Sequence, residues 1–331
     1  MREAKYDVVG VGHAIVDILA NTTDSFLTAH GIAKGSMTLV DGFRAESLGR
    51  AMTSAIEASG GSAANTMVGI ASFGGSAAFI GKVNDDRLGQ VFAADIRKSG
   101  VHFHGAPADG RVATASSHIL ITPDGQRSMN TYLGCAPALT DADMSVDLLS
   151  SAKILYVEGY LWDTPGAKAA IRAAVAHAKS AAHKVAFTLS DPFCVGRWRE
   201  EFMDLIARDV DILFANELEA KALYETERFD DAFQAIRKWG KTAAITRSAH
   251  GSVVVQDWRV HILDAEPVER VEDTTGAGDQ YAAGFLFGHA RGATLDLCGR
   301  LGGLAAAEVI SHIGPRPRAS LKSLAAKAGL I

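Results

Sequence analysis

The chain has 331 residues, of which 48% are hydrophobic, and its formal net charge is −5. This length and apolar content can bury one large α/β core, alone or with a small additional domain. The weakly acidic charge balance argues against the basic surface of a nucleic-acid-binding protein. The sequence has no apolar run of about 18 residues, which a membrane-spanning helix would need. We therefore expect neither nucleic acid nor membrane among its partners.

Strand-like and helical segments alternate along most of the chain. Strands are predicted at 7–12, 37–40, 77–80, 154–158, 184–189, 211–214, 242–246 and 252–256, and helices at 45–58, 63–73, 88–99, 166–182, 199–207, 217–224 and 230–238 and from residues 276 and 295. Such alternation predicts a mostly parallel sheet covered by helices on both faces. Ligands of these sheets bind at the carboxyl ends of the strands.

Residues 101–133 differ from the rest because they show no helical pattern. Residues 115–122 and 128–133 are predicted as strands on either side of the hairpin signal Asp124-Gly125. We expect antiparallel structure inserted into the α/β chain at this point.

The three cysteines, Cys135, Cys194 and Cys298, lie far apart and are odd in number. Their spacing favours neither a disulfide framework nor a zinc site, and it is typical of reduced intracellular thiols. Residues 1–7 are charged and lack the apolar stretch of a signal peptide. These features predict a cytoplasmic protein.

One glycine-rich segment, Asp273-Thr274-Thr275-Gly276-Ala277-Gly278-Asp279, precedes a predicted helix. Small residues at a helix start leave backbone N–H groups bare, and the helix dipole adds positive potential, so the segment can hold an anion such as a phosphoryl group. A carboxylate at Asp279 could then deprotonate an attacking hydroxyl. The alternative is an ordinary helix start in which Asp273 or Thr274 is the N-cap.

This segment resembles the second signature of the PfkB (ribokinase-like) carbohydrate kinase family. The first signature is matched by Gly60-Gly61-Ser62-Ala63-Ala64-Asn65, followed by Ser72-Phe73-Gly74-Gly75 and Gly81-Lys82-Val83. Within the family, residues 11–17 and Arg127-Ser128 are most similar to the adenosine kinase branch. A dinucleotide-binding fingerprint is not an equal alternative, because Ile15 stands where its last glycine belongs.

The resemblance implies an α/β, ribokinase-like fold: a mostly parallel sheet flanked by helices, with a small β lid domain. Residues 1–12, 42–101 and 136–331 would form the large nucleotide-binding and catalytic domain. Residues 13–41 and 102–135 would form the lid over the substrate. The oligomeric state stays open between a monomer and a homodimer.

The resemblance also assigns catalytic roles. Asp279 would be the catalytic base, and Gly276, Ala277 and Gly278 would form the anion hole. Arg127, which follows the hairpin turn, would reach the transferring phosphate from the lid. A solvated hairpin arginine is the alternative for that position.

Substrate contacts follow from the same comparison. Asp17 would bind two ribose hydroxyls, and Gly60, Gly61 and Asn65 would complete the sugar clamp. An apolar and aromatic slot for a nucleobase would be drawn from Met37, Leu133 and Tyr160, with Trp162 and Phe193 as further candidates.

ATP would be the phosphoryl donor, with Asn216, Thr246, Arg247, Gly251, Thr275, Gly276 and Gly278 near its phosphates and ribose. Glu219 would organise Mg²⁺, largely through water. K⁺ activates part of the family, and no residue here decides whether it is needed.

The resemblance thus predicts an ATP-dependent kinase that phosphorylates the 5′-OH of a nucleoside, with adenosine as the favoured substrate. The alternatives are a PfkB-type kinase of ribose, fructose or a related sugar, a guanosine or inosine kinase, and a nucleoside-binding sensor that has lost catalysis. Retention of Asp279, the glycine segment and Arg127 argues against the sensor.

Overall fold

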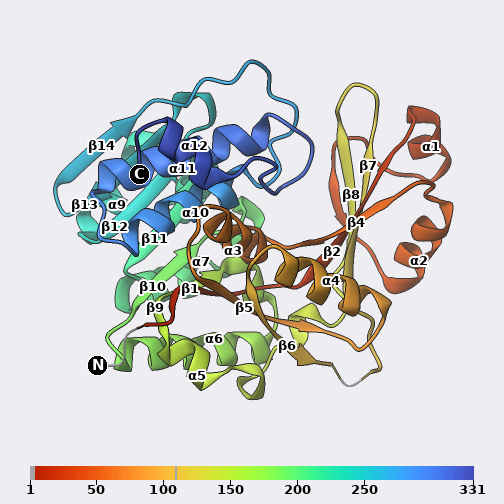
Figure 1. Ribbon diagram of the computed structural model, residues 1–331, viewed down its shortest axis with the longest axis horizontal. Helices are drawn as coiled ribbons and strands as arrows, with labels where there is room; N and C mark the ends of the chain where they lie inside the picture. The colour runs from red at the N-terminus through yellow and green to blue at the C-terminus, as the bar shows by residue number, and fades with distance from the viewer. Residues whose placement is uncertain (1–3, 109) are drawn as a thin grey trace.

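The computed structural model describes residues 4–108 and 110–331, and it has two β-sheets (Figure 1). The larger has nine strands in the order β14-β13-β12-β11-β10-β9-β1-β5-β6. Neighbouring strands from β6 to β12 are parallel, and β13 and β14 are antiparallel additions at one edge. Its strands are β1 (Tyr6–Val11), β5 (Ala77–Val83), β6 (His102–Pro107), β9 (Ala152–Glu158), β10 (Lys184–Thr188), β11 (Ile212–Asn216), β12 (Thr242–Thr246), β13 (Ser252–Gln256) and β14 (Arg259–Leu263). The predicted mostly parallel α/β sheet is confirmed.

Helices cover both faces of this sheet because its central strands are apolar on both sides. Val9 and Leu155 face a core formed with α5 (Val146–Ser150), α6 (Pro165–Ser180), α7 (Pro192–Arg208), α8 (Glu217–Leu223) and α9 (Phe229–Trp239). Val8 and Ile154 face the opposite core, formed with α3 (Ser62–Ser72), α4 (Arg87–Lys98), α10 (Ala277–His289) and α11 (Leu295–Ile310). The last helix, α12 (Leu321–Lys327), packs with α3, α10 and α11 around Phe73 and Phe287.

The second sheet, called the small sheet below, has five strands in the order β3-β8-β7-β2-β4. They are β2 (Ile15–Asn21), β3 (Met37–Leu39), β4 (Ile56–Gly60), β7 (Ala115–Ile121) and β8 (Arg127–Tyr132). The helices α1 (Asp24–Ala29) and α2 (Gly42–Ala51) lie on its outer side, away from α10 (Figure 1).

The structure corrects three expectations about these segments. The predicted helix at 45–58 is instead α2 followed by β4, and both belong with the small sheet although 42–101 was assigned to the large domain. Residues 102–107 were assigned to the lid, but they form β6, which pairs in parallel with β5. The alternation of β4 is masked by small residues and glycine, so only sheet pairing with β2 reveals it.

No helix in the described part of the chain is long and apolar enough to cross a membrane. The side chains of Cys135, Cys194 and Cys298 are buried.

Candidate active site

The turn into α10 forms an open cluster of backbone amides. Gly276 is the N-cap, with φ at +78°, and no side chain caps the helix. A Cβ at Gly276 would lie 2.5 Å from the carbonyl oxygen of Pro315, so the close approach excludes other residues. A Cβ at Gly278 would meet nothing within 4 Å, which leaves space in front of the first turn. Bare amides and the helix dipole make this space suitable for an anion.

The alternative reading, an ordinary N-cap at Asp273 or Thr274, is wrong because the chain enters the helix only after Gly276. The Asp273 carboxylate instead braces the turn: its Oδ1 accepts a hydrogen bond from the Thr275 amide at 3.0 Å, and its Oδ2 accepts one from the Gly314 amide at 2.8 Å. Asp273 therefore shapes the turn that presents the amides.

Asp279 lies in the first turn of α10, and two donors from the start of α3 hold its carboxylate. Ser62 Oγ donates to Oδ1 at 2.6 Å, and Asn65 Nδ2 donates to Oδ2 at 3.1 Å. Burial raises the pKa of Asp279 to about 6, and the two hydrogen bonds and the charge of Arg316 act against that rise. A carboxylate tuned in this way is ionised at neutral pH and remains basic enough to accept a proton.

Asp17 lies within β2, and its side chain is buried. It approaches the site because β4 ends beside it in glycine: a Cβ at Gly60 would lie 2.4 Å from Asp17 Oδ2. Gly61, with φ at +97°, then turns the chain into α3. Burial raises the pKa of Asp17 to about 6; Arg316 and Arg127 lower it, and the charge of Asp279 raises it.

Side-chain alternation in the small sheet explains which face carries Asp17. In the register of the sheet, Asp17 pairs with Ser117 and Ser117 pairs with Thr131, so the three share one face. Ser117 Oγ and Thr131 Oγ1 lie 2.9 Å apart. His118 belongs to the opposite face, where its ring lies close to α2 at Gly49. The face of Asp17 is thus the polar inner face, opposite to α2.

Arg127 begins β8 and forms a buried ion pair with Asp273. The Arg127 side chain is only 8% exposed, and its Nε and Nη2 atoms are buried without a hydrogen-bond partner among the described residues. The predicted alternative of a solvated hairpin arginine is therefore wrong. The pair links the small sheet to the turn before α10, and two donors stay available beside that turn.

Asn216 and Glu219 form a reciprocal cap at the carboxyl end of β11. The Asn216 amide donates to Glu219 Oε2 at 2.9 Å, Asn216 Nδ2 donates to Oε1 at 2.6 Å, and the Glu219 amide donates to Asn216 Oδ1 at 2.8 Å. Burial raises the pKa of Glu219 to about 7, and the charges of Asp191 and Asp279 add to the rise. Glu219 thus lies within the electrostatic reach of Asp279.

The other expected nucleotide contacts are only partly brought together. Thr246 ends β12, the strand beside β11, and Gly251 follows it in a tight turn with φ at +73°. Arg247 is engaged elsewhere: its Nε donates to Glu217 Oε2 at 2.9 Å, and its guanidinium lies 4.0 Å from the centre of the Phe229 ring. Arg247 therefore anchors α8 and α9 at this edge.

The residues expected to form the base slot differ in their burial and in their contacts. Tyr160 is half-buried after β9, and its hydroxyl donates to the Ser190 carbonyl at 3.3 Å. Trp162 is wholly buried, packs edge-on against Phe187 and donates to Glu201 at 2.9 Å, so it is a core residue and the expectation for it is wrong.

The remaining base-slot candidates lie nearer the surface. Met37, on the edge strand β3, is 50% exposed, and Phe193 on α7 is 81% exposed. Leu133 is half-buried just after β8.

Three residues of the site were not predicted to be functional from the sequence: Ser62, Glu158 and Arg316. Ser62 stands inside the first glycine signature, which could have identified it. Glu158 is a charge at the end of an apolar parallel strand, and its two carboxylate oxygens accept from the amides of His13 and Ala63, each at 2.8 Å. Burial raises the pKa of Glu158 to about 7. Arg316 follows α11 in a segment without any motif.

No group of three or more His, Cys, Asp or Glu residues that could hold a metal ion occurs at 4–108 or 110–331. Glu219 interacts electrostatically with Asp279, and both of its carboxylate oxygens already accept hydrogen bonds from Asn216. Such a carboxylate fits a Mg²⁺ ion that arrives with a nucleotide and keeps most of its water, and it does not fit a metal held by protein ligands alone.

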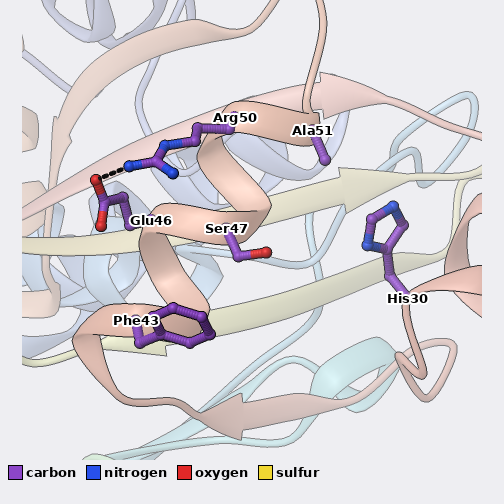
Figure 2. A pocket seen from close by; sticks show the side chains of 6 residues that line it. All are labelled: His30, Phe43, Glu46, Ser47, Arg50 and Ala51. Carbon is purple, nitrogen blue, oxygen red and sulfur yellow. Dashed lines mark hydrogen bonds and ion pairs between the residues drawn. The ribbon is translucent and has the colours of Figure 1, made fainter.

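A shallow depression on the outer side of the small sheet is unrelated to this cluster. It is lined by His30, Phe43, Glu46, Ser47, Arg50 and Ala51. In Figure 2 the side chain of Arg50 turns back along α2 toward Glu46, away from His30. Exposed pairs of this kind, four residues apart on one helix, contribute only about 0.3–0.5 kcal/mol.

Comparison with known proteins decides the family. Residues 37–321 match the pfkB family carbohydrate kinases. The chain belongs to this family. The pfkB kinases use ATP to phosphorylate a hydroxyl group, so this protein is an ATP-dependent phosphotransferase with an alcohol acceptor.

Among solved pfkB-type structures, the adenosine kinase from Sinorhizobium meliloti is 53% identical, with a TM-score of 0.91 over 98% of this chain and 100% of that one. A probable sugar kinase protein from Rhizobium etli CFN 42 is 47% identical, with a TM-score of 0.92 over 99% and 100%. The predicted ribokinase-like fold is thereby confirmed.

Curated relatives include the adenosine kinase of Saccharomyces cerevisiae, 27% identical over 93% of this chain and 96% of the relative. Fructokinase-1 of Oryza sativa is 27% identical over 70% and 73%. The family therefore contains both nucleoside and sugar kinases that are similar to this chain.

Proposed function

We propose that this protein is an adenosine kinase, which transfers the γ-phosphoryl group of ATP to the 5′-OH of adenosine and releases ADP and AMP. The proposal rests on one arrangement: the Asp279 carboxylate stands beside the open amides of the α10 turn. The 53% identity to the Sinorhizobium adenosine kinase supports the choice of nucleoside. The reaction would be an in-line displacement at phosphorus.

Asp279 would accept the proton of the attacking 5′-OH, and the amides near Gly276 and Gly278 would hold the transferring phosphoryl group. Charge on that group changes during transfer, so donors that are already in place stabilise the transition state more than the ground state. Ser62 and Asn65 hold the carboxylate at the edge of the cradle. Their role is to aim the base.

Asp17 would accept hydrogen bonds from two ribose hydroxyls. Within residues 4–108 and 110–331 no group forms a hydrogen bond with its carboxylate, and burial disfavours its charge. A diol that donates hydrogen bonds to both oxygens of Asp17 would offset part of the free-energy cost of burying its charge, and a sugar without the diol would not. Gly60 and Gly61 would allow the substrate close to the backbone.

We propose that the small sheet is the lid, with hinges next to His13 and Ala63. Glu158 supports this assignment because its carboxylate ties the backbone at both points. Arg127 would be the lid residue that neutralises phosphoryl charge on closure. Its unpartnered nitrogens beside Asp273 support that role.

Mg²⁺ would enter with ATP, and Glu219 and Asn216 would face its water shell. The ion would neutralise charge on the nucleotide phosphates. Thr246, Gly251 and Thr275 would line the nucleotide, whereas Arg247 would act only through its contact with Glu217. A cytoplasmic location is proposed from the odd number and wide spacing of the cysteines, which do not suit a disulfide framework.

The test is a coupled ADP-release assay with adenosine, guanosine, inosine, ribose and fructose, with and without Mg²⁺ and K⁺. The adenosine assignment predicts the highest kcat/KM for adenosine and little turnover of either free sugar. A preference for fructose or ribose would instead establish the second candidate, a sugar kinase, which the Rhizobium protein's description and the fructokinase relatives favour.

A further inference from the structure

Arg316 lies on the segment between α11 and α12, which is fastened to the start of α10. The Gly314 amide donates to Asp273, and the Pro315 carbonyl accepts from Gln280 Nε2 at 3.0 Å. Pro315 also packs against Gly276, where a Cβ would come within 2.5 Å of it. The backbone that carries Arg316 is therefore positioned by the same turn that forms the anion cradle.

The guanidinium of Arg316 is buried among polar groups of α3, α4 and β4. Its side chain is 14% exposed. Nε donates to Asn65 Oδ1 at 3.0 Å, Nη1 donates to Asp95 Oδ2 at 3.1 Å and to Ser59 Oγ, and Nη2 is buried without a partner among the described residues. A guanidinium has donors only, so the atom of Asn65 that faces it must be the oxygen.

This contact decides which way the Asn65 amide points. With Oδ1 held by Arg316, the NH₂ group is left to donate to Asp279 Oδ2. Rotation of the amide by half a turn would place NH₂ against the guanidinium and oxygen against the carboxylate, and both contacts would be repulsive. The chain of contacts Arg316–Asn65–Asp279 therefore has one favourable arrangement.

Arg316 also acts on the site through its positive charge. The titratable groups that interact electrostatically with Asp279 come from β2, β9, the turn after β9, α8 and the Arg316 segment. They are Asp17, Tyr156, Glu158, Tyr160, Glu219 and Arg316. The charge of Asp279 opposes ionisation of the other carboxylates in this set, and Arg316 is the cation of the set. Its charge lowers the pKa of both Asp17 and Asp279.

We propose that Arg316 is a positioning residue of the reaction: it orients Asn65 toward the Asp279 carboxylate and places a cation one side chain away from that carboxylate. Arg316 touches neither phosphoryl group nor hydroxyl in this role; it acts through Asn65 and through its charge. The proposal rests on the proposed function of Asp279 as the base. A merely structural role, fastening the segment to Asp95 on α4, is the competing explanation.

Two variants and one matched control test the proposal. Arg316→Gln removes the charge, and Arg316→Lys keeps the charge but loses the Nε–H that faces Asn65. Arg318→Gln is the control: it lies on the same segment, but its guanidinium donates to the Ile313 carbonyl, away from the cluster. Each is assayed for kcat and KM from pH 5 to 9, with unfolding followed separately.

In Arg316→Gln we expect the acid limb of kcat to move upward by roughly one pH unit, and kcat at its plateau to fall at least tenfold. Arg316→Lys should restore the position of the acid limb but not the whole plateau, since only the charge returns. Arg318→Gln should match the wild type. If Arg316→Gln does not fold, the plateau and acid limb of Arg316→Lys carry the test.

A second readout does not depend on turnover. The carboxyl carbon of Asp279 is titrated by ¹³C NMR in the free protein and assigned from Asp279→Asn. The midpoint should rise in Arg316→Gln and return in Arg316→Lys. An unchanged midpoint and acid limb in Arg316→Gln, with only stability lost, would overturn the proposal. A wild type that phosphorylates none of the five substrates would overturn the function instead, and the NMR titration would still decide the role of Arg316.

Discussion

Arg127 and Asp273 form a buried ion pair between the small sheet and the turn before α10. The two residues are 146 positions apart, and the same Asp273 carboxylate also accepts from the amides of Thr275 and Gly314. The contact between the small sheet and the turn before α10 and the shape of that turn thus depend on the same side chain. Two buried nitrogens of Arg127, Nε and Nη2, have no hydrogen-bond partner in the part of the chain that the structure describes.

This pair predicts coupling between stability and catalysis. Arg127→Gln should lower kcat by about 10²–10³, because a donor to the phosphoryl group is lost. In chemical denaturation, Arg127→Gln and Asp273→Asn should each lower the free energy of unfolding, and the double variant should lose less than the sum by about 1–3 kcal/mol. Strictly additive losses would show that the pair contributes no coupling.

Asp279→Asn tests the base directly. We expect kcat to fall by about 10²–10⁴ while the affinities for ATP and nucleoside, measured by calorimetry, change only a few-fold, because the amide cannot accept the proton. Asp296→Asn is the matched control, since Asp296 occupies the first turn of the neighbouring helix α11. If Asp279→Asn retained more than a tenth of wild-type turnover, another group would have to be the base.

The two glycines of the cradle should respond differently to alanine. Gly276→Ala should lower the free energy of unfolding by roughly 1–3 kcal/mol, because φ is positive and the methyl group meets Pro315. Gly278→Ala should fold as well as the wild type, since the methyl group meets open space in a helical turn. It should nevertheless lower kcat, because that space is where the phosphoryl group would lie.

Thermal unfolding and steady-state kinetics of the two alanine variants separate these effects. Full activity in Gly278→Ala would place the phosphoryl group elsewhere.

Asp17→Asn should weaken nucleoside binding and, at neutral and alkaline pH, raise the free energy of unfolding. The pKa of Asp17 is raised in the folded protein to about 6, so folding favours the protonated form. The charge of Asp17 therefore destabilises the wild type. This loss in the free energy of unfolding is absent below about pH 4, grows between about pH 4 and 6, and stays constant above about pH 6 at no more than about 3 kcal/mol. The variant should therefore be more stable than the wild type at pH 8 and equal to it near pH 3.5.

Denaturant unfolding at both pH values measures this difference, and KM for the nucleoside should rise sharply in the same variant. A variant that is less stable at pH 8 would show that the charge of Asp17 is compensated in the free protein.

The site could be anticipated wherever its residues are contiguous in the chain. The segment from Asp273 to Asp279 combines a positive-φ glycine, a bare helix start and a carboxylate within seven residues, and helix geometry alone brings these together. The same holds for Asn216 and Glu219, whose spacing closes a reciprocal cap. The parallel core followed from apolar strands alternating with helices.

Other features depended on contacts between distant segments. Glycine and small residues hid the strand β4, which exists because β2 offers it a partner. Trp162 and Tyr160 follow the same strand, yet only the packing of α7 shows that Trp162 is core. Arg316 belongs to no sequence motif, and its proposed role depends on its contact with Asn65, which is 251 residues away in the chain.

Local chemistry was therefore readable from the sequence, because hydrogen-bond geometry within a turn or helix is set by a few neighbouring residues. The partners of a buried charge were not readable, because burial and long-range electrostatics exist only once the two sheets have packed together.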